Sequence, residues 1–452
     1  MSHIHILENE KKEYLCYKSS YDILWEFQQG IASLDENYLK ENKRCTLVCG
    51  GMIAFDIGIS NFLNELYKKE KKLFLLSEVT GEYRRITKER IVFPFVCTPH
   101  LLAKEILIRE MDLIVSNKYK DFCLCDPILS NVAECYEMMY EGQLGENYSW
   151  VWTFYANQYV NRFLEALKPK TIILWNAFYP FHILIKKIAS QKGIPVYYLE
   201  FGSLPGTFSF DKKGQMGGSS FAVKCGIYRY LPVSRKQLFN ANEVLTYLRQ
   251  NNVTRYKEPR NIVSVDELQY YKKKRPTIVF FGQNDAESGL RPFTDETRRY
   301  HSPFFKSSLD ALSTIKRLSY QCGWNVIYKP HPIVIDRGES YKITGVDIVE
   351  HVSINSLLDF ADVVVTIASQ ISYMALIKKI PVVMLGYNQL HNKGCTYEVD
   401  NLEDIENKIR RAIKFRYTKE QERCFQKHIA KMLKFYLYDD LIKRSVRYGK
   451  KL

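Results

Sequence analysis

Short apolar runs alternate with segments of helical spacing along most of the chain. In the first half, the pattern predicts strands at 45–51, 72–78, 170–177 and 195–203, and helices at 52–70 and 181–193. Gly193 stops the second of these helices. Strand–helix–strand units of this kind indicate a parallel sheet with helices on both faces.

The alternation restarts after a charged, proline-containing stretch near Arg255 to Pro276, where the linker is predicted. The second run predicts strands at 277–283, 325–332, 362–369 and 380–386, and helices at 304–323, 354–361 and 371–379. A further helix with a polar face is predicted at 234–252, before the linker. A long helical region from Lys419 to Lys450 closes the chain. We therefore expect domains at 1–255 and 256–416, followed by a helical segment at 417–452.

This pattern predicts the α/β class, with two Rossmann-like, doubly wound domains that face each other across a cleft and a C-terminal helical segment. Two such halves joined by a linker, with ligands at the carboxyl ends of the strands, describe the GT-B architecture. A two-domain dehydrogenase would share the outline. However, no strand is followed by GxGxxG, and "CGGMIAFD" offers only the pair Gly50–Gly51.

Charge adds a preference for anionic partners. The net charge is +15, from 65 basic and 50 acidic residues, which favours a phosphate-bearing substrate, an acidic membrane surface or nucleic acid. A basic surface that only keeps the protein soluble explains the same charge. The basic residues are spread out and match no nucleic-acid-binding module, so we expect no nucleic-acid partner.

Cysteine spacing and hydropathy narrow the class of protein further. The 11 cysteines are scattered and form no CxxC pair, which predicts reduced thiols and no metal site. Neither a signal-peptide core nor an apolar run of membrane-spanning length is found. We expect a cytoplasmic protein, soluble or peripheral at the inner face of the plasma membrane, without a cofactor.

The stretch "NVIYKPHPIVID" places a titratable ring at the end of a predicted strand. Pro332 disfavours helix at His331, so the chain leaves the strand extended, at the edge where open α/β sheets build their sites. There His331 can bond or protonate a phosphate oxygen, and Lys329 adds a fixed charge. The alternative is a histidine in a surface loop with no task.

Polar residues also end the strand at 362–369. Ser369 lies in the cap region of the next predicted helix, where free backbone N–H groups and a hydroxyl can bind an anion, and Ser372 lies one turn on. The alternative is an ordinary helix cap. Together with the "KPHP" stretch, we expect it to form the second wall of a phosphate pocket.

Two further loops carry candidate residues. After the strand at 277–283, Gln283, Asp285 and Ser288 can hold sugar hydroxyls or supply a base, or form only a polar turn. The loop "LEFGSLPGTFSFDKKGQMGGSS" is rich in glycine and places Glu200 at a strand end, where Gly202 lets the backbone turn. For Asp211 in the same loop, a solvated turn is the preferred interpretation.

These four stretches, in this order, resemble the bacterial capsule polysaccharide synthesis family, which includes Kdo (3-deoxy-manno-octulosonic acid) transferases. The resemblance runs from about Ile172 to Thr396. The family's loop, "KPHP", "ADVVVT-x-x-S", "K-x-PVV-x-LG" and "G-x-T" motifs are matched by "EFGSLPGTFSFDKKG", Lys329–Pro332, Ala361–Ser369, Lys379–Gly386, and Gly394 with Thr396.

The resemblance implies a glycosyltransferase of surface polysaccharide synthesis that uses a nucleotide-activated sugar, with a CMP-linked donor suspected. It implies catalytic roles for Glu200, Asp285 and His331, and substrate or nucleotide binding by the residues Gly202, Gln283, Ser288, Lys329, Ser369 and Ser372. The donor would bind the second domain, and a lipid-linked or oligosaccharide acceptor would bind the first. The net positive charge suits contact with an anionic membrane.

The chain departs from the family at three positions. Phe201 and Pro205 stand where the family often has a second acid and an arginine, and Met374 replaces a glutamate expected to bind the donor ribose. Two alternatives therefore stay open. One is a teichoic-acid-type polyol-phosphate transferase, although "TIASQIS" lacks the usual D-Y-S-S helix start. The other is a catalytically degenerate binding subunit of a polysaccharide assembly machine.

Overall fold

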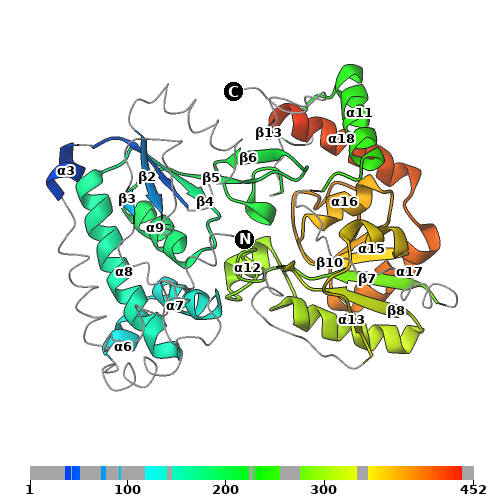
Figure 1. Ribbon diagram of the computed structural model, residues 1–452, viewed down its shortest axis with the longest axis horizontal. Helices are drawn as coiled ribbons and strands as arrows, with labels where there is room; N and C mark the ends of the chain where they lie inside the picture. The colour runs from blue at the N-terminus through cyan, green and yellow to red at the C-terminus, as the bar shows by residue number, and fades with distance from the viewer. Residues whose placement is uncertain are drawn as a thin grey trace. The chain divides into compact units, whose positions relative to one another are not determined.

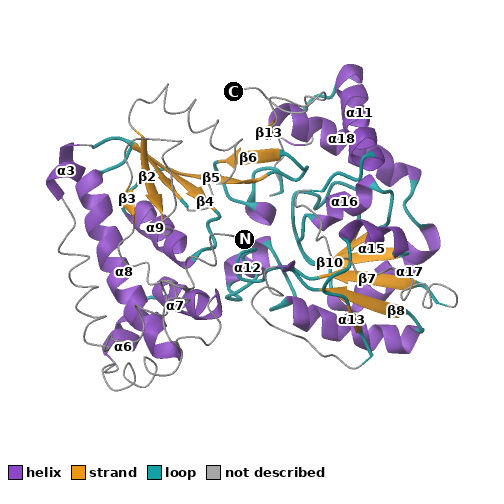
Figure 2. Cartoon of the chain, in the orientation of Figure 1, coloured by secondary structure: helices purple, strands orange, loops and turns teal. Residues whose placement is uncertain are grey.

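The structure is a computed structural model of the 452-residue chain. It describes residues 36–41, 43–50, 73–77, 91–92, 118–139, 145–222, 228, 230–254, 275–332 and 345–439. The chain divides into two compact units, Met1–Leu199 and Glu200–Leu452. Figure 1 labels the helices and strands, and Figure 2 colours them by type.

The first unit is built on a parallel sheet with the strand order β5-β4-β1-β2-β3. Its strands are β1 (Thr46–Cys49), β2 (Leu73–Ser77), β3 (Ile91–Val92), β4 (Thr171–Trp175) and β5 (Val196–Phe201), the last of which crosses the unit boundary. The described helices are α3 (Glu36–Glu41), α6 (Lys118–Leu124), α7 (Pro127–Met139), α8 (Gly145–Leu167) and α9 (Pro180–Gln191). Leu47 and Ile172 of the sheet pack with α7, α8 and α9 in one core.

The second unit contains a parallel sheet of six strands with the order β12-β11-β10-β7-β8-β9. Its strands are β7 (Thr277–Phe281), β8 (Asn325–Lys329), β9 (Asp347–Ile348), β10 (Val363–Thr366), β11 (Val382–Met384) and β12 (Tyr397–Glu398). Its helices are α11 (Arg235–Gln250), α12 (Asp295–Tyr300), α13 (Ser308–Cys322), α15 (Ile354–Phe360), α16 (Ile371–Ile377), α17 (Ile405–Phe415) and α18 (Lys419–Phe435), with short 3₁₀ turns η3 (Met216–Gly218) and η5 (Leu402–Asp404).

Alternate residues of the central strand β7 enter two different cores. Ile278 and Phe280 pack with α13 and α17 on one face, whereas Val279 and Phe281 pack with α11, α16 and α18 on the other. A strand buried on both faces has to be apolar throughout, which is why "TIVFF" reads as a continuous run. The predicted α/β class with two parallel-sheet units is confirmed.

The observed unit boundary differs from the predicted domain boundary. The units divide at Leu199, earlier than the predicted residue 255, because α11 packs against α16 and α18 of the second unit. Residues 255–274 of the predicted linker lie outside the described residues, as do the predicted helix at 52–70 and residues 440–452. The linker and the predicted domain bounds therefore stay proposals.

The described part of the predicted C-terminal helical region is one helix followed by a short strand. α18 ends at Phe435, and the chain then forms β13 (Leu437–Asp439), which pairs antiparallel with β6 (Thr207–Asp211). Leu437 and Tyr436 are buried, so the amphipathic spacing that suggests helix here comes from a short strand packed on its own unit.

Candidate active site

The candidate residues of the second unit lie at the carboxyl ends of neighbouring parallel strands. Gln283 follows β7, Lys329 ends β8, and Ser369 follows β10. In the sheet, β7 lies between β8 and β10, so one strand separates the "KPHP" stretch from Ser369. Strands separated by one neighbour lie about 10 Å apart, so any phosphate pocket here spans the end of β7.

Gln283 joins two of these strand ends. Its buried side chain donates from Nε2 to Ser288 Oγ (2.7 Å) and accepts from the Ala368 backbone N–H at Oε1 (3.1 Å). Both polar ends of the amide are thereby used within the protein. Gln283 and Ser288 consequently support the loop after β7 and fix it to the end of β10.

Asp285 caps the helix that follows the same loop. Its Oδ1 accepts from Ser308 Oγ (2.6 Å) and its Oδ2 accepts from the Ser308 backbone N–H (2.9 Å), at the first residue of α13. A carboxylate at a helix N-terminus is stabilised by the free N–H groups and the helix dipole. This position gives Asp285 a structural task that the sequence did not indicate.

Lys329 and His331 flank a proline at the end of β8. The ammonium of Lys329 is buried and donates to the backbone carbonyl of Glu350 (2.7 Å), which anchors its charge at the sheet edge. His331 is partly buried, and residues 333–344 beyond it lie outside the described residues. β8 ends at Lys329, so residues 330–332 of the strand predicted at 325–332 lie beyond it.

The turn after β10 is held by its own hydroxyls and by an asparagine. Ser372 is fully buried, donates from Oγ to the Ser369 carbonyl (2.8 Å) and accepts from Asn388 Nδ2 (3.1 Å). Ser369 Oγ accepts from the Ile371 N–H at 3.4 Å, while the N-cap residue of α16 is Gln370. Ser372 is therefore part of the scaffold of this turn.

Glu200 lies near the end of β5 and accepts hydrogen bonds from three separate segments of the second unit. Its Oε1 accepts from Gln389 Nε2 (3.2 Å), the Met216 backbone N–H (3.3 Å) and Ser209 Oγ (3.4 Å). The carboxylate is only partly buried. The sequence did not indicate Gln389; its place just after the "PVVMLG" strand was the available signal.

The loop around Glu200 is closely packed. A Cβ on Gly202 would meet Thr207 Oγ1 and, at 2.8 Å, Leu437 Cδ2, so the position requires glycine for space. Gly202 has no positive φ, and its N–H donates to the Thr207 carbonyl (2.8 Å). Space on the Cα, and not the sharp turn that the sequence suggested, accounts for this glycine.

Asp211 is buried, contrary to the predicted solvated turn. It is 4% exposed, not solvated, and its carboxylate accepts from the Lys213 N–H (2.7 Å), the Ser220 N–H (2.8 Å) and Ser220 Oγ (2.6 Å). These bonds close the loop between β6 and residue 220. The loop is thus a rigid part of the unit, folded around two acidic side chains.

A buried polar network supports the unit from within. His428 is fully buried and contacts the hydroxyls of Tyr228 (2.8 Å, Nδ1) and Tyr373 (2.9 Å, Nε2). Burial, together with the nearby charges of Lys393 and Lys431, holds the pKa of His428 well below its ordinary value, so the ring is neutral. No pattern in the sequence indicates this network.

Two other properties of the described residues bear on function. No described helix combines the length and the apolar character needed to cross a bilayer. Among the described side chains, no group of three His, Cys, Asp or Glu residues gathers where a metal ion could bind.

One comparison with known proteins found a matching family model. Residues 229–429 match the family model for capsule polysaccharide biosynthesis proteins. A comparison with curated protein sequences gave no match.

Among solved structures, the chain is similar to the beta Kdo 2,7 transferase KpsC of Thermosulfurimonas dismutans, with 20% identity, 62% of this chain and 82% of that chain covered, and a TM-score of 0.42. It is also similar to the beta Kdo 2,4 transferase KpsC of the same organism (17%, 59% and 80%, TM-score 0.38) and to α,α-trehalose 6-phosphate synthase of Burkholderia multivorans (9%, 86% and 95%, TM-score 0.40). The match to the capsule polysaccharide biosynthesis family model spans residues 229–429, which contain the strand-end loops described above.

Proposed function

We propose that the protein is a glycosyltransferase of capsule polysaccharide synthesis, which transfers a sugar from a nucleotide-activated donor to a saccharide or lipid-linked acceptor. The observation that carries the proposal is the position of the family segment. It contains the polar loops after β7, β8 and β10, which meet at the carboxyl edge of one parallel sheet. Nucleotides typically bind parallel sheets at this edge.

Donor binding is assigned to the strand-end loops. Lys329 supplies a charge anchored by the Glu350 carbonyl, and His331 and Ser369 offer hydrogen bonds to phosphate oxygens on either side of β7. A CMP-linked acidic sugar such as Kdo is the proposed donor, on the resemblance of the motifs. Gln283, Ser288 and Ser372 hold these loops in place.

Glu200 is the proposed general base. Its carboxylate takes the proton of an acceptor hydroxyl as that oxygen bonds to the anomeric carbon of the donor sugar. The bond from this carbon to the phosphate oxygen breaks, and the leaving nucleotide keeps the electron pair. Lys329 and His331 then stabilise the negative charge on the phosphate. Asp285 is the weaker candidate for base because Ser308 already binds both of its oxygens.

Nucleotide binding provides the first test. We expect one nucleotide among CMP, CDP, UDP and GDP to stabilise the protein by about 2.7 kcal/mol at ~100 times its dissociation constant. His331→Ala should weaken that binding and leave the melting temperature unchanged. His351→Ala is the matched control, because His351 is exposed, lies past β9 and is not assigned to the site.

The outcome decides between the proposal and its failure. Transfer of sugar from the matching nucleotide sugar, measured as release of the free nucleotide, supports it. If no nucleotide binds, or if the His331 and His351 variants bind the nucleotide equally well, the donor assignment fails.

A second candidate, a binding subunit without turnover, is favoured by one observation. Met374 occupies the position of the family's glutamate and packs against the apolar core of the second unit, so it offers no partner for a ribose hydroxyl. Nucleotide binding without any release of nucleotide from nucleotide sugars would select this candidate. A peripheral contact of the basic chain with anionic membrane is part of either proposal.

A further inference from the structure

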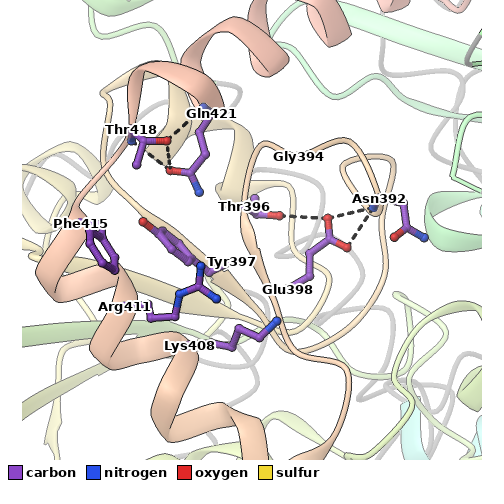
Figure 3. A pocket seen from close by; sticks show the side chains of 10 residues that line it. All are labelled: Asn392, Gly394, Thr396, Tyr397, Glu398, Lys408, Arg411, Phe415, Thr418 and Gln421. Atoms are coloured by element: carbon purple, nitrogen blue, oxygen red, sulfur yellow. Dashed lines mark hydrogen bonds between the residues drawn. The ribbon is translucent and has the colours of Figure 1, made fainter.

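A hollow of about 650 Å³ lies among β12, α17 and the start of α18. Lys408, Arg411 and Phe415 come from one face of α17 and form one wall, as Figure 3 shows. Tyr397 and Glu398 of β12 form the floor. The volume is in the range of small-molecule sites, about 300–1,000 Å³.

The hollow is separate from the proposed donor site. Arg416 follows the last residue of α17, and its Nη1 contacts Asp362 Oδ1 (2.7 Å), immediately before β10 begins. The hydroxyl of Tyr397 donates to the Arg416 carbonyl (2.7 Å). The C-terminal end of α17 therefore lies at the amino ends of the strands, whereas the donor loops follow their carboxyl ends.

The lining carries two cations, Lys408 and Arg411, against one acid, Glu398, whose oxygens are bonded within the protein. Both oxygens of Glu398 accept from the Asn392 backbone N–H (2.8 and 3.0 Å), and Oε2 lies 3.0 Å from His391 Nδ1. Lys408 pairs with Asp400 (3.3 Å). In the part of the chain that the structure describes, no carboxylate forms an ion pair with Arg411. An exposed guanidinium is thus left to bind an oxyanion.

The remaining lining suits a ring that carries hydroxyl groups. Phe415 is 51% exposed and offers apolar ring surface to the hollow, whereas Tyr397 is 8% exposed and contributes little. Asn392 and Thr396 add polar groups along the opposite side (Figure 3). The lining therefore combines one exposed aromatic ring with polar and charged side chains.

We propose that this hollow is a second binding site, for an anionic saccharide, in which Arg411 holds the carboxylate or phosphate group and the Phe415 ring contacts the sugar. A guanidinium binds either oxyanion through two parallel hydrogen bonds. The inference rests on the proposed function, because an acidic capsule saccharide is the ligand that a transferase of this class would retain. The site would hold an already synthesised part of the polysaccharide while the next sugar is added.

The test is a titration of the full chain with three probes: glucuronic acid, glucose 6-phosphate and neutral glucose. Binding is monitored by saturation-transfer NMR. We expect saturable binding of at least one of the two acids and much weaker binding of glucose. Arg411→Gln should weaken binding of the acid at least about tenfold. Arg411→Lys should have a smaller effect, because lysine keeps the charge although it cannot form the two parallel hydrogen bonds of a guanidinium. The acid that binds identifies the carboxylate or the phosphate as the group recognised.

Arg410→Gln is the matched control for charge. Arg410 is the next residue of α17, but its Nε pairs with Glu406 (2.7 Å) and its guanidinium lies 5.6 Å from the ring centroid of Trp324. Its loss should change the affinity for the acid less than about twofold. An equal effect of Arg410→Gln and Arg411→Gln would mean unspecific attraction and would overturn the proposal.

Two further outcomes also count against the site. Absence of saturable binding of both acids up to about 10 mM would remove it. A loss of nucleotide binding in Arg411→Gln would assign the hollow to the donor site instead. Failure of the proposed function is distinct, because it is measured as missing nucleotide binding or transfer in the unaltered protein and leaves the saccharide titration unaffected.

Discussion

Replacing Glu200 by glutamine separates a catalytic carboxylate from a structural one. The change keeps the size of the side chain and an oxygen that can accept hydrogen bonds, but it removes the charge. Glu200 Oε1 accepts from three donors at 3.2, 3.3 and 3.4 Å, all long for hydrogen bonds. A bond to a charged group contributes about 1.5–3 kcal/mol and a neutral one about 0.5–1.5 kcal/mol.

The structural part of the effect follows from these distances. Long bonds lie at the low end of each range, so each of the three loses about 1 kcal/mol and the free energy of unfolding should fall by about 3 kcal/mol in total. For a unit of this size, that corresponds to a fall of about 6–12 °C in the melting temperature. The catalytic part is measured separately: loss of a general base should reduce transfer about 100-fold or more, equivalent to about 2.7 kcal/mol in the barrier.

The assay is sugar transfer with the donor that the nucleotide panel identifies, at a temperature well below both melting points. Gln389→Met is the control, because it removes one donor to Glu200 and leaves the carboxylate in place. We expect Gln389→Met to lose stability and keep most of its transfer rate. Near wild-type transfer in Glu200→Gln, or equal losses of transfer in both variants, would refute the assignment of Glu200 as the base.

Three further predictions concern stability. Gly217→Ala should lower the free energy of unfolding by about 1–3 kcal/mol or more, because its Cβ would meet a backbone carbonyl, while Gly218→Ala, whose Cβ would lie 3.9 Å from Tyr300, should cost much less; equal melting temperatures would contradict this. Burial lowers the pKa of His182 to about 4 from 6.5, so the unfolded chain binds more protons between these values and the stability of the first unit should fall as the pH drops from about 6.5 to about 4. His182→Gln should flatten that dependence in urea titrations, and an unchanged slope would reject the explanation. Tyr373→Phe leaves a ring nitrogen of His428 without its partner at 2.9 Å and should cost about 1–3 kcal/mol in chemical denaturation, whereas unchanged stability would mean that the contact contributes little.

The parallel sheet of the second unit was predictable from the sequence because its central strands are buried on both faces. The runs at 277–281 and 363–366 are fully apolar or nearly so, and each is followed by a helix of clear spacing. The strand β13 was not predictable, because three residues after an amphipathic helix continue the helical spacing. Its identity depends on pairing with β6, far away in the sequence.

The candidate site was predictable only in part, for a similar reason. Glycine and proline marked the loops, and the strand ends placed Lys329 and Ser369 at one edge of the sheet. Which polar groups face each other depends on the paths of the loops. The contact between Glu200 and Gln389 joins residues 189 positions apart, and no local pattern records it.

The pairing of β6 with β13 has a consequence for the order in which the protein folds. β6 ends at Asp211 and its partner begins at Leu437, so the two strands are synthesised far apart in time. At about 5–20 residues per second, the edge of β6 waits on the order of tens of seconds on the ribosome before its partner is made. An unpaired strand edge attracts other strands, and the nascent chain is therefore most prone to aggregation during this interval. Slowing translation beyond residue 211 should reduce the yield of folded protein more than slowing it before that point.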